Sequence, residues 1–165
     1  MCAWGDIAVG GQRPSAGHPS KSAVLGLLAA ALGVRRDEED RQKSLADAYA
    51  MAVRVDASGE LLRDYHTAQV PPERRGVRYY TRQDELRSDK LNTILSQRDY
   101  RMDASYSVAV WAKNDSPPWA LLDIQSALQR PHFSLYLGRK SCPLSLPLQA
   151  RVINVDTLKA AFDDF

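Results

Sequence analysis

The sequence predicts a single α+β domain whose elements follow a ferredoxin-like order. Its 165 residues are enough for one core-bearing domain, and 44% of them are apolar, which is typical of a globular protein. The periodic segments run in the order helix, strand, strand, excursion, strand, helix. This order is most of a βαββαβ unit, and the element that it lacks is the first strand.

The first helix follows a loop. Residues 5–19 (GDIAVGGQRPSAGHP) are rich in glycine and proline, which predicts a loop that packs against another part of the chain. Ser20 or Ser22 can cap the helix, and Gly33 is a natural residue to end it. The run 23–34 (AVLGLLAAALGV) is apolar on nearly every face, which predicts burial. It is too short to span a bilayer and has no signal-peptide layout before it, so neither a membrane nor a secreted location is expected.

Residues 37–48 predict an exposed helix with acids in its first turn, where the helix dipole favours them. The alternating run 49–56 (YAMAVRVD), the turn DASG and the run 60–70 (ELLRDYHTAQV) predict a hairpin. From residue 71 to 101 the sequence is polar, basic in patches and only partly periodic. We expect this segment to project from the core.

Regular structure resumes after the excursion. The alternating run 104–112 (ASYSVAVWA) predicts a strand, and 119–129 (WALLDIQSALQ) has helical spacing and ends before Pro131. The run 148–156 (LQARVINVD) predicts a last strand. A short terminal helix follows, with Asp156 or Thr157 as its cap.

The formal net charge of +2 is nearly neutral, but the charges are segregated. Residues 124–155 contain four cations and no acid, and residues 1–36 contain four cations and one acid. Acids form a block at 37–40 and a cluster at the C-terminus. Such segregation can build a basic face on a nearly neutral protein, and it is equally compatible with an ordinary solvated surface.

No metal site or cofactor is expected. Cys2 and Cys142 have neither a disulfide framework nor the spacing of a zinc site, and a reducing cytoplasm is their simplest location. The sequence has no P-loop, no paired histidines and no GxSxG motif. His18, His66 and His132 are far apart in the sequence.

The run 131–144 (PHFSLYLGRKSCPL) is the first candidate site. Gly138 can take a positive φ or let the backbone approach a ligand closely, with amides directed outward to bind an anion. Arg139 and Lys140 add positive charge for phosphate, and Tyr136 offers a flat face for a base. The alternative is a simple turn with two solvated cations.

The start of the first helix is the second candidate site. Ser20, Lys21 and Ser22 offer free amides, hydroxyls and an ammonium to a phosphate, although the same serines can act as caps alone. Arg13 and His18, on the preceding loop, are within reach of the same ligand if the loop folds over the helix start.

The run 63–67 (RDYHT) is the third candidate. On a strand, Asp64 and His66 share one face, and Arg63, Tyr65 and Thr67 share the other. A histidine near basic residues can act as general base in metal-independent RNA cleavage. The alternative is a structural histidine that makes a hydrogen bond.

Five stretches taken together resemble one known family. The runs CAWGD, RPSAGHPSKSAVLGLLAAALGV, LRDYHT, YRMDASYSVAVW and PHFSLYLGRKSCPLSLPL are similar in order and spacing to the CasD family. This family is the type I-E CRISPR-associated subunit of the Cascade surveillance complex and a member of the RAMP superfamily. The resemblance covers roughly residues 2–150.

The resemblance implies a non-catalytic RNA-binding subunit that grips the 5′ handle of the mature CRISPR RNA (crRNA) and caps the filament of backbone subunits. Its expected partners are the crRNA, the Cascade backbone subunit, the large subunit that reads the protospacer-adjacent motif (PAM) and, indirectly, target DNA. The expected RNA-binding residues are Arg13, His18, Ser20, Lys21, Ser22, Tyr136, Gly138, Arg139, Lys140 and Ser141.

The resemblance also implies a modified RRM-type ferredoxin-like domain with a thumb-like excursion. We expect residues 1–70 and 102–165 to form the domain and 71–101 to form the thumb. Family members usually start with a strand that precedes the CAWGD motif, so we expect an upstream start codon or a missing first strand. The expected thumb contacts are Arg74, Arg75, Arg78, Arg82, Arg87 and Lys90.

Two other functions stay open. The type I-C relatives of the family mature CRISPR RNA by cleavage, and His66 is the residue that would support this activity here. A pure assembly subunit is the other possibility, because the basic excursion can pair with acidic protein neighbours as readily as with phosphate.

Overall fold

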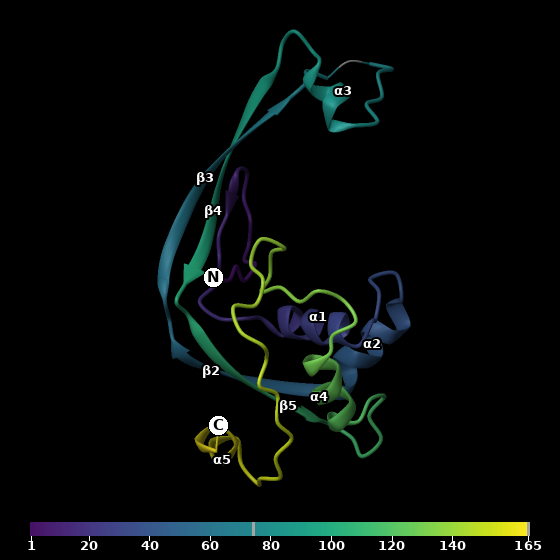
Figure 1. Cartoon of the computed structure of the whole chain (residues 1–165), viewed down its shortest axis with the longest axis vertical. Helices are drawn as coiled ribbons and strands as arrows, with labels where there is room; N and C mark the ends of the chain where they lie inside the picture. Colours follow the sequence, from purple (N-terminus) through teal and green to yellow (C-terminus); the bar gives the residue numbers. More distant parts are fainter. Residues whose placement is uncertain (74, 165) are drawn as a thin grey trace.

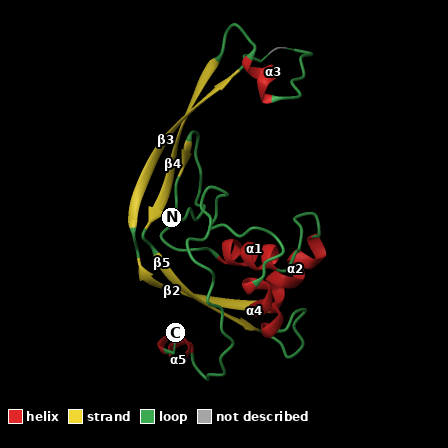
Figure 2. Ribbon diagram, viewed as in Figure 1, coloured by secondary structure: helices red, strands yellow, loops and turns green. Residues whose placement is uncertain are grey.

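The long strands of the molecule form a curved ribbon, and most of the helices gather beside one end of it (Figures 1 and 2). The computed structural model describes residues 1–73 and 75–164. Helices and strands are both well represented, so the predicted α+β class is confirmed. The far end of the ribbon projects away from the helices as an arm (Figure 1).

Two antiparallel strand pairs follow one another along the ribbon. Strand β2 (Tyr49–Ala57) pairs with β5 (Ser105–Ala112), and β3 (Glu60–Val70) pairs with β4 (Asn92–Met102). The short strand β1 (Gln12–Arg13) lies parallel to β4 on its other side. The sheet orders are therefore β1-β4-β3 and β2-β5.

The predicted hairpin over residues 49–70 is wrong. Strands β2 and β3 do not pair with each other, because each has its partner later in the chain. The ribbon bends where Gly59 (φ +64°) lies opposite Asp103 (φ +53°). A Cβ on Gly59 would lie 2.2 Å from the carbonyl oxygen of Met102, so only glycine fits this close approach. The run DASG thus makes a bend between consecutive strands.

Helix α1 (Lys21–Ala31) starts as predicted. Its N-cap is Ser20, whose Oγ accepts a hydrogen bond from the Ala23 amide at 3.2 Å. Gly33 follows the helix with φ +73°. Burial on nearly every face is wrong for the first half of the helix, where Gly26 is exposed. Its buried residues, Leu28, Ala29 and Ala31, lie in the second half.

The main core lies between the helices and the adjacent end of the β2–β5 pair. Helices α2 (Glu39–Ala48) and α4 (Leu121–Gln129) pack against α1 there, and both were predicted within two residues of their ends. The buried residues of this core are Leu28, Ala29, Val34, Leu45, Tyr49 and Ile124. The Tyr49 hydroxyl joins the sheet to the chain before α4, because it donates to the carbonyl oxygen of Trp119.

The segment 71–101 is only partly irregular. Helix α3 (Arg82–Leu86) lies at the tip of the arm, with Thr81 as its cap. From Asn92 onward the segment belongs to β4, so the prediction that periodic structure is lost up to Arg101 is wrong there.

The C-terminal region differs from the prediction in one element. Residues 148–156 contain no strand, so the predicted last strand is wrong. Helix α5 (Leu158–Asp163) forms as predicted, and its cap is Thr157. With one two-stranded and one three-stranded sheet, the structure does not confirm the ferredoxin-like arrangement. Within residues 1–73 and 75–164, no helix is long and apolar enough to cross a membrane.

Candidate nucleic-acid interface

Residues 136–141, called here the glycine turn, pack directly on the N-terminal segment. Gly138 has φ +86°, and a Cβ there would lie 1.8 Å from the carbonyl oxygen of Ala3. The Ala3 amide donates to the Leu137 carbonyl oxygen at 3.0 Å, and the Leu137 amide donates to that of Cys142 at 2.7 Å. The Gly138 amide donates to the carbonyl oxygen of Tyr136, so it is not directed outward to an anion. Packing therefore accounts for the glycine.

Arg139 fixes the glycine turn to the sheet. Its Nη1 donates to the Asp99 carbonyl oxygen at 3.1 Å, and its Nη2 donates to that of Arg13 at 2.9 Å. The guanidinium also lies 4.8 Å from the centre of the Tyr100 ring. The cation expected to bind phosphate thus holds the turn against β1 and β4.

Lys140 and Ser141 remain accessible on the same turn. Both residues are exposed. No hydrogen bond or ion pair engages the Lys140 ammonium in the part of the chain that the structure describes. Lys140 is therefore the cation of the turn that is free to meet a phosphate.

The two loop residues expected near the RNA lie in different places. Arg13 belongs to β1, where its Nη1 donates to the carbonyl oxygens of Gly10 at 2.6 Å and Gln12 at 2.8 Å. Its own carbonyl oxygen accepts from Arg139, so the structure does bring Arg13 to the glycine turn. His18 is exposed and its Nδ1 lies 3.2 Å from the Pro19 carbonyl oxygen, next to the start of α1.

The start of α1 forms a separate group. Ser20 acts as the cap and its Oγ lies 2.9 Å from that of Ser22. The Lys21 ammonium donates to the Ala46 carbonyl oxygen of α2 at 2.9 Å. Among the described residues, no hydrogen bond links this group to the glycine turn.

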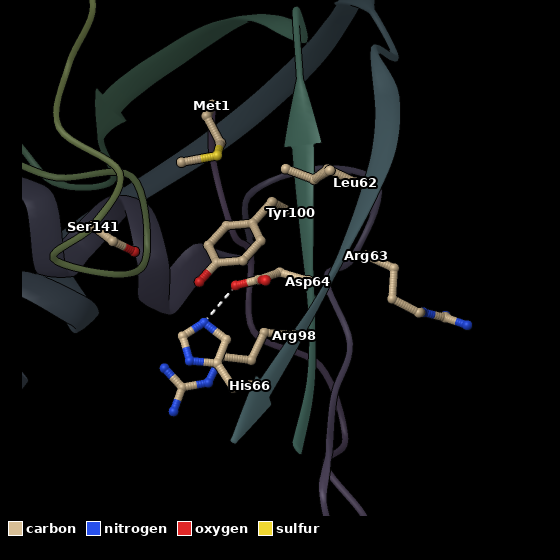
Figure 3. Close-up of a pocket in the computed structure, with 8 residues that line it drawn as sticks. All are labelled: Met1, Leu62, Arg63, Asp64, His66, Arg98, Tyr100 and Ser141. Carbon is tan, nitrogen blue, oxygen red and sulfur yellow. Dashed lines mark ion pairs between the residues drawn. The ribbon is translucent and has the colours of Figure 1, made fainter. Parts of the chain in front are cut away.

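A pocket of about 380 Å³ opens beside the glycine turn, on one face of the β3–β4 pair. Figure 3 shows the residues that line it: Met1, Leu62, Arg63, Asp64, His66, Arg98, Tyr100 and Ser141. Asp64 and His66 lie on the same face of β3, as the alternation predicts, and His66 Nε2 pairs with the Asp64 carboxylate. We call this the dyad pocket.

Arg98 and Tyr100 are residues of the dyad pocket that the sequence analysis missed. They lie opposite Asp64 and Leu62 in the register of β3 and β4. Arg98 Nε is buried and has no hydrogen-bond partner among the described residues. Residues 92–102 form a strand, and side chains two residues apart on a strand share a face. The alternation in SQRDYRM therefore could have placed Arg98 and Tyr100 on one face.

Arg63 lines the pocket, but its guanidinium is turned to the other face of the ribbon (Figure 3). There Nε and Nη2 bind the two carboxylate oxygens of Asp99 at 2.9 and 3.1 Å. This bidentate pair lowers the pKa of the buried Asp99 carboxyl group from its usual value.

The cations of the arm's tip are partly neutralised. Arg82 pairs with Glu85, and Arg87 lies 3.8 Å from Asp84. Arg78 lies 5.3 Å from the Tyr80 ring centre.

Two other expected thumb residues, Arg75 and Lys90, are exposed, and no hydrogen bond or ion pair engages their side chains within residues 1–73 and 75–164. Arg74 lies outside the described residues. The tip thus offers at least two cations for a partner.

The described residues contain no group of three histidine, cysteine, aspartate or glutamate side chains that could hold a metal ion. The two cysteines are buried and unpaired.

The chain is similar to known proteins over most of its length. Residues 1–164 match the family described as CRISPR-associated protein (Cas_Cas5). The protein named CRISPR system Cascade subunit CasD, from Escherichia coli (strain K12), is 35% identical over 156 residues, which are 90% of this chain and 65% of that protein.

Two solved structures are similar in fold. A chain of a CRISPR RNA-guided surveillance complex has a TM-score of 0.66 and 35% identity, with 93% of this chain and 60% of that chain covered. A structure titled as a crystal structure of Cas protein has a TM-score of 0.58 and 29% identity, with 97% and 64% covered. The chain thus spans less than two thirds of the length of these relatives.

Proposed function

The chain belongs to the CRISPR-associated Cas_Cas5 family, and from this membership we propose that it is a non-catalytic, RNA-binding subunit of a type I-E Cascade complex. It anchors the 5′ handle of the crRNA and caps the filament of backbone subunits. One observation carries the proposal. Arg139 fixes the glycine turn to β4, so that the exposed Lys140 and Ser141 lie beside a pocket that contains Arg98.

The handle runs along the glycine turn. Lys140 binds a phosphate, because its ammonium is exposed and has no internal partner among the described residues. Ser141 donates to the same backbone. Arg98 receives a second phosphate at the dyad pocket, since its Nε is buried without a hydrogen bond in the described chain.

The remaining predicted residues have supporting roles. Arg139, Gly138 and Tyr136 hold the shape of the turn, and Arg13 supplies the carbonyl oxygen to which Arg139 is bound. Ser20, Lys21, Ser22 and His18 form a second anion-binding region at the start of α1, which contacts a neighbouring part of the RNA.

The arm contacts protein. We assign residues 71–101 to a thumb that meets the first backbone subunit, through exposed cations such as Arg75 and Lys90. The large PAM-reading subunit is the second protein neighbour, and target DNA is met through it. We also propose that residues 1–70 and 102–165 belong to one ferredoxin-like domain of the RRM type.

The proposal is tested by RNA binding across a salt series, with a handle-length RNA. Lys140→Ala is expected to weaken binding and to make the slope of log K against log salt shallower by about 0.7, because one phosphate contact is lost. Lys113→Ala is the matched control, since this exposed lysine lies at the far end of β5. Identical slopes for both variants and the wild type would contradict the proposal.

A second candidate function is metal-independent RNA cleavage in the dyad pocket. The observation that favours it is the pairing of His66 with Asp64 in the pocket that also holds Arg98. His66 would take the proton of a ribose 2′-hydroxyl, whose oxygen attacks the adjacent phosphorus. The 5′-oxygen leaves as a hydroxyl after it takes a proton from water, and Arg98 stabilises the charged phosphorane.

His66→Ala separates the two functions. Cleavage of a precursor CRISPR RNA by the wild type that is lost in His66→Ala would establish the enzyme. Handle binding with no cleavage by either protein supports the anchoring function. A third possibility, assembly without RNA contact, predicts no RNA binding by the wild type at any salt concentration.

A further inference from the structure

The face of the β3–β4 pair opposite the dyad pocket carries a row of three side chains that the proposed function does not use. Tyr65 of β3 lies opposite Gln97 of β4, and Gln97 lies opposite Gln12 of β1. Side chains of paired residues share a face of a sheet, so the phenol ring and the two amides form one continuous row. We call it the Tyr–Gln row.

A shallow pocket lies over the Tyr–Gln row. It measures about 230 Å³ and is lined by Gly11, Gln12, Tyr65, Leu95, Ser96 and Gln97. Gly11 is required for its shape, because a Cβ there would lie 2.7 Å from the Leu95 carbonyl oxygen. Strand β1, which supplies Gln12, pairs with β4 on the side away from β3; its segment lies beside β4 in Figure 1.

The polar groups of the row are unused. Within the described residues, the Tyr65 hydroxyl and the side-chain amides of Gln12 and Gln97 make no hydrogen bond. Tyr65 is 58% exposed and Leu95 is 51% exposed, so the ring is open to a ligand. An aromatic face flanked by amides that can both donate and accept matches a nucleobase, which has a flat face and a polar edge.

We propose that the Tyr–Gln row binds one unpaired base of single-stranded RNA. The base stacks on Tyr65, and its polar edge meets the amides of Gln97 and Gln12. The inference rests on the proposed function, since the RNA is the one held at the glycine turn.

The two sites share the edge of one sheet. Arg139 of the glycine turn binds the carbonyl oxygen of Arg13, and the next residue along β1 is Gln12. Because neighbouring side chains of a strand point to opposite faces, an RNA that leaves the turn reaches the row by crossing this short edge strand.

The chemistry of the row favours a base over a protein partner. A hydrophobic protein contact would leave two glutamine amides facing apolar groups without hydrogen bonds, which is costly. The cation nearest the row on this face, Arg63, is neutralised by Asp99, so the site suits an uncharged base better than an acidic peptide.

The test uses handle-length RNAs in which 2-aminopurine replaces one nucleotide at a time, bound to the full-length protein. Stacking quenches 2-aminopurine, so the wild type is expected to quench strongly at one position. Tyr65→Ala is expected to abolish this quenching and to weaken binding by about 5- to 100-fold. Tyr65→Phe keeps the ring and is expected to behave as the wild type does.

The matched control is Tyr80→Ala, because this tyrosine of the arm's tip is also exposed, at 79%. It is expected to leave the quenching unchanged.

Gln12→Ala with Gln97→Ala is expected to retain quenching but to reduce the preference among bases at the quenched position by about 5-fold or more.

The outcomes separate the two proposals. If the wild type binds RNA, and quenching is the same in Tyr65→Ala, the base site is wrong and the handle-binding function stands. If quenching is lost in Tyr80→Ala but kept in Tyr65→Ala, the base stacks at the tip of the arm and the row is excluded. If the wild type binds no RNA, both proposals are wrong.

Discussion

Gly138 shows at the scale of one residue how closely the glycine turn approaches the N-terminal segment. Its Cα faces the Ala3 carbonyl oxygen, and its φ is positive. The same segment is held by backbone hydrogen bonds from both sides, so it cannot move away without loss of those bonds. The identity of this residue therefore matters for the stability of the fold.

Gly138→Ala is expected to lower the free energy of unfolding by at least about 2 kcal/mol, because it adds both backbone strain and a steric clash. Urea unfolding measures this change. Gly26→Ala is the control: it lies on the exposed side of α1 with no atom near its added Cβ, so it is expected to stabilise the protein by about 0.5–1 kcal/mol. Equal effects of the two substitutions would contradict the packing of the turn.

Asp99 links stability to pH. Its pKa is lowered in the folded protein by the Arg63 guanidinium, whereas the unfolded chain has the ordinary value of about 3.9. A lowered folded pKa means that the carboxylate contributes its full stability above the unfolded pKa. This contribution is lost as the pH falls through the folded pKa.

Asp99→Asn is therefore expected to be less stable than the wild type at neutral pH and to lose less stability between pH 5 and pH 2, an interval set by the unfolded value of about 3.9. Thermal unfolding at several pH values gives the comparison. Asp115→Asn, at an exposed position in a bend, serves as the control. If Asp99→Asn and the wild type lose stability in parallel on acidification, the Arg63–Asp99 pair does not act as described.

The sequence identifies the cations of the glycine turn, but it does not show which of them is bound within the protein and which is exposed to a ligand. Arg139 and Lys140 are adjacent and equally basic in the sequence. The carbonyl oxygens of Asp99 and Arg13 bind Arg139 internally, whereas no described residue binds the Lys140 ammonium. These contacts join residues far apart in the chain, so no local pattern predicts them.

At the scale of elements, α1 was predicted accurately because its signals are local. A capping serine, a run of apolar residues and a terminal glycine determine its ends. The predicted pairing of β2 with β3 was wrong because strand pairing is not determined by local signals. The run DASG signals a change of direction, but whether it makes a turn or a bend depends on which strand pairs with which, and that is decided by residues 92–112.

The cap of α1 provides a test at this scale. Ser20→Ala is expected to lower the free energy of unfolding by about 0.5–2 kcal/mol, because the Ala23 amide loses its acceptor. Ser22→Ala removes a hydroxyl that caps nothing and is expected to have little effect. The reverse order of the two effects would show that Ser22 is the cap.

At the scale of the whole molecule, the arm and the helical end differ in burial. The β2–β5 pair lies against the main core, whereas most side chains of the outer half of β3 and β4 are exposed. This difference predicts unequal local stability, because few buried contacts oppose opening of the arm. An arm that is ordered by its partners suits the proposed role in assembly.

Hydrogen exchange measures this directly. Amides of residues 49–55 and 107–112 are expected to exchange more slowly than those of 66–70 and 92–96 in the isolated protein. On assembly with a backbone subunit, the outer arm is expected to gain protection. An arm that is already as protected as the β2–β5 pair would contradict the assignment of the thumb.

The α+β class could be predicted from periodicity, but the sheet topology could not. Strand β4 lies within a segment whose charges mask its alternation, and the predicted last strand, 148–156, found no partner. In both cases the deciding factor is the neighbouring strand, which periodicity alone does not reveal.

The proposed function requires the glycine turn and the dyad pocket to hold the crRNA handle. The most direct measurement is photo-cross-linking of handle-length RNA to the full-length protein, followed by mass spectrometry of the cross-linked peptides. Cross-links are expected in residues 136–141 and in strand β4 near Arg98. Cross-links confined to the arm's tip, residues 75–90, would contradict the proposed function and would assign RNA binding to the thumb.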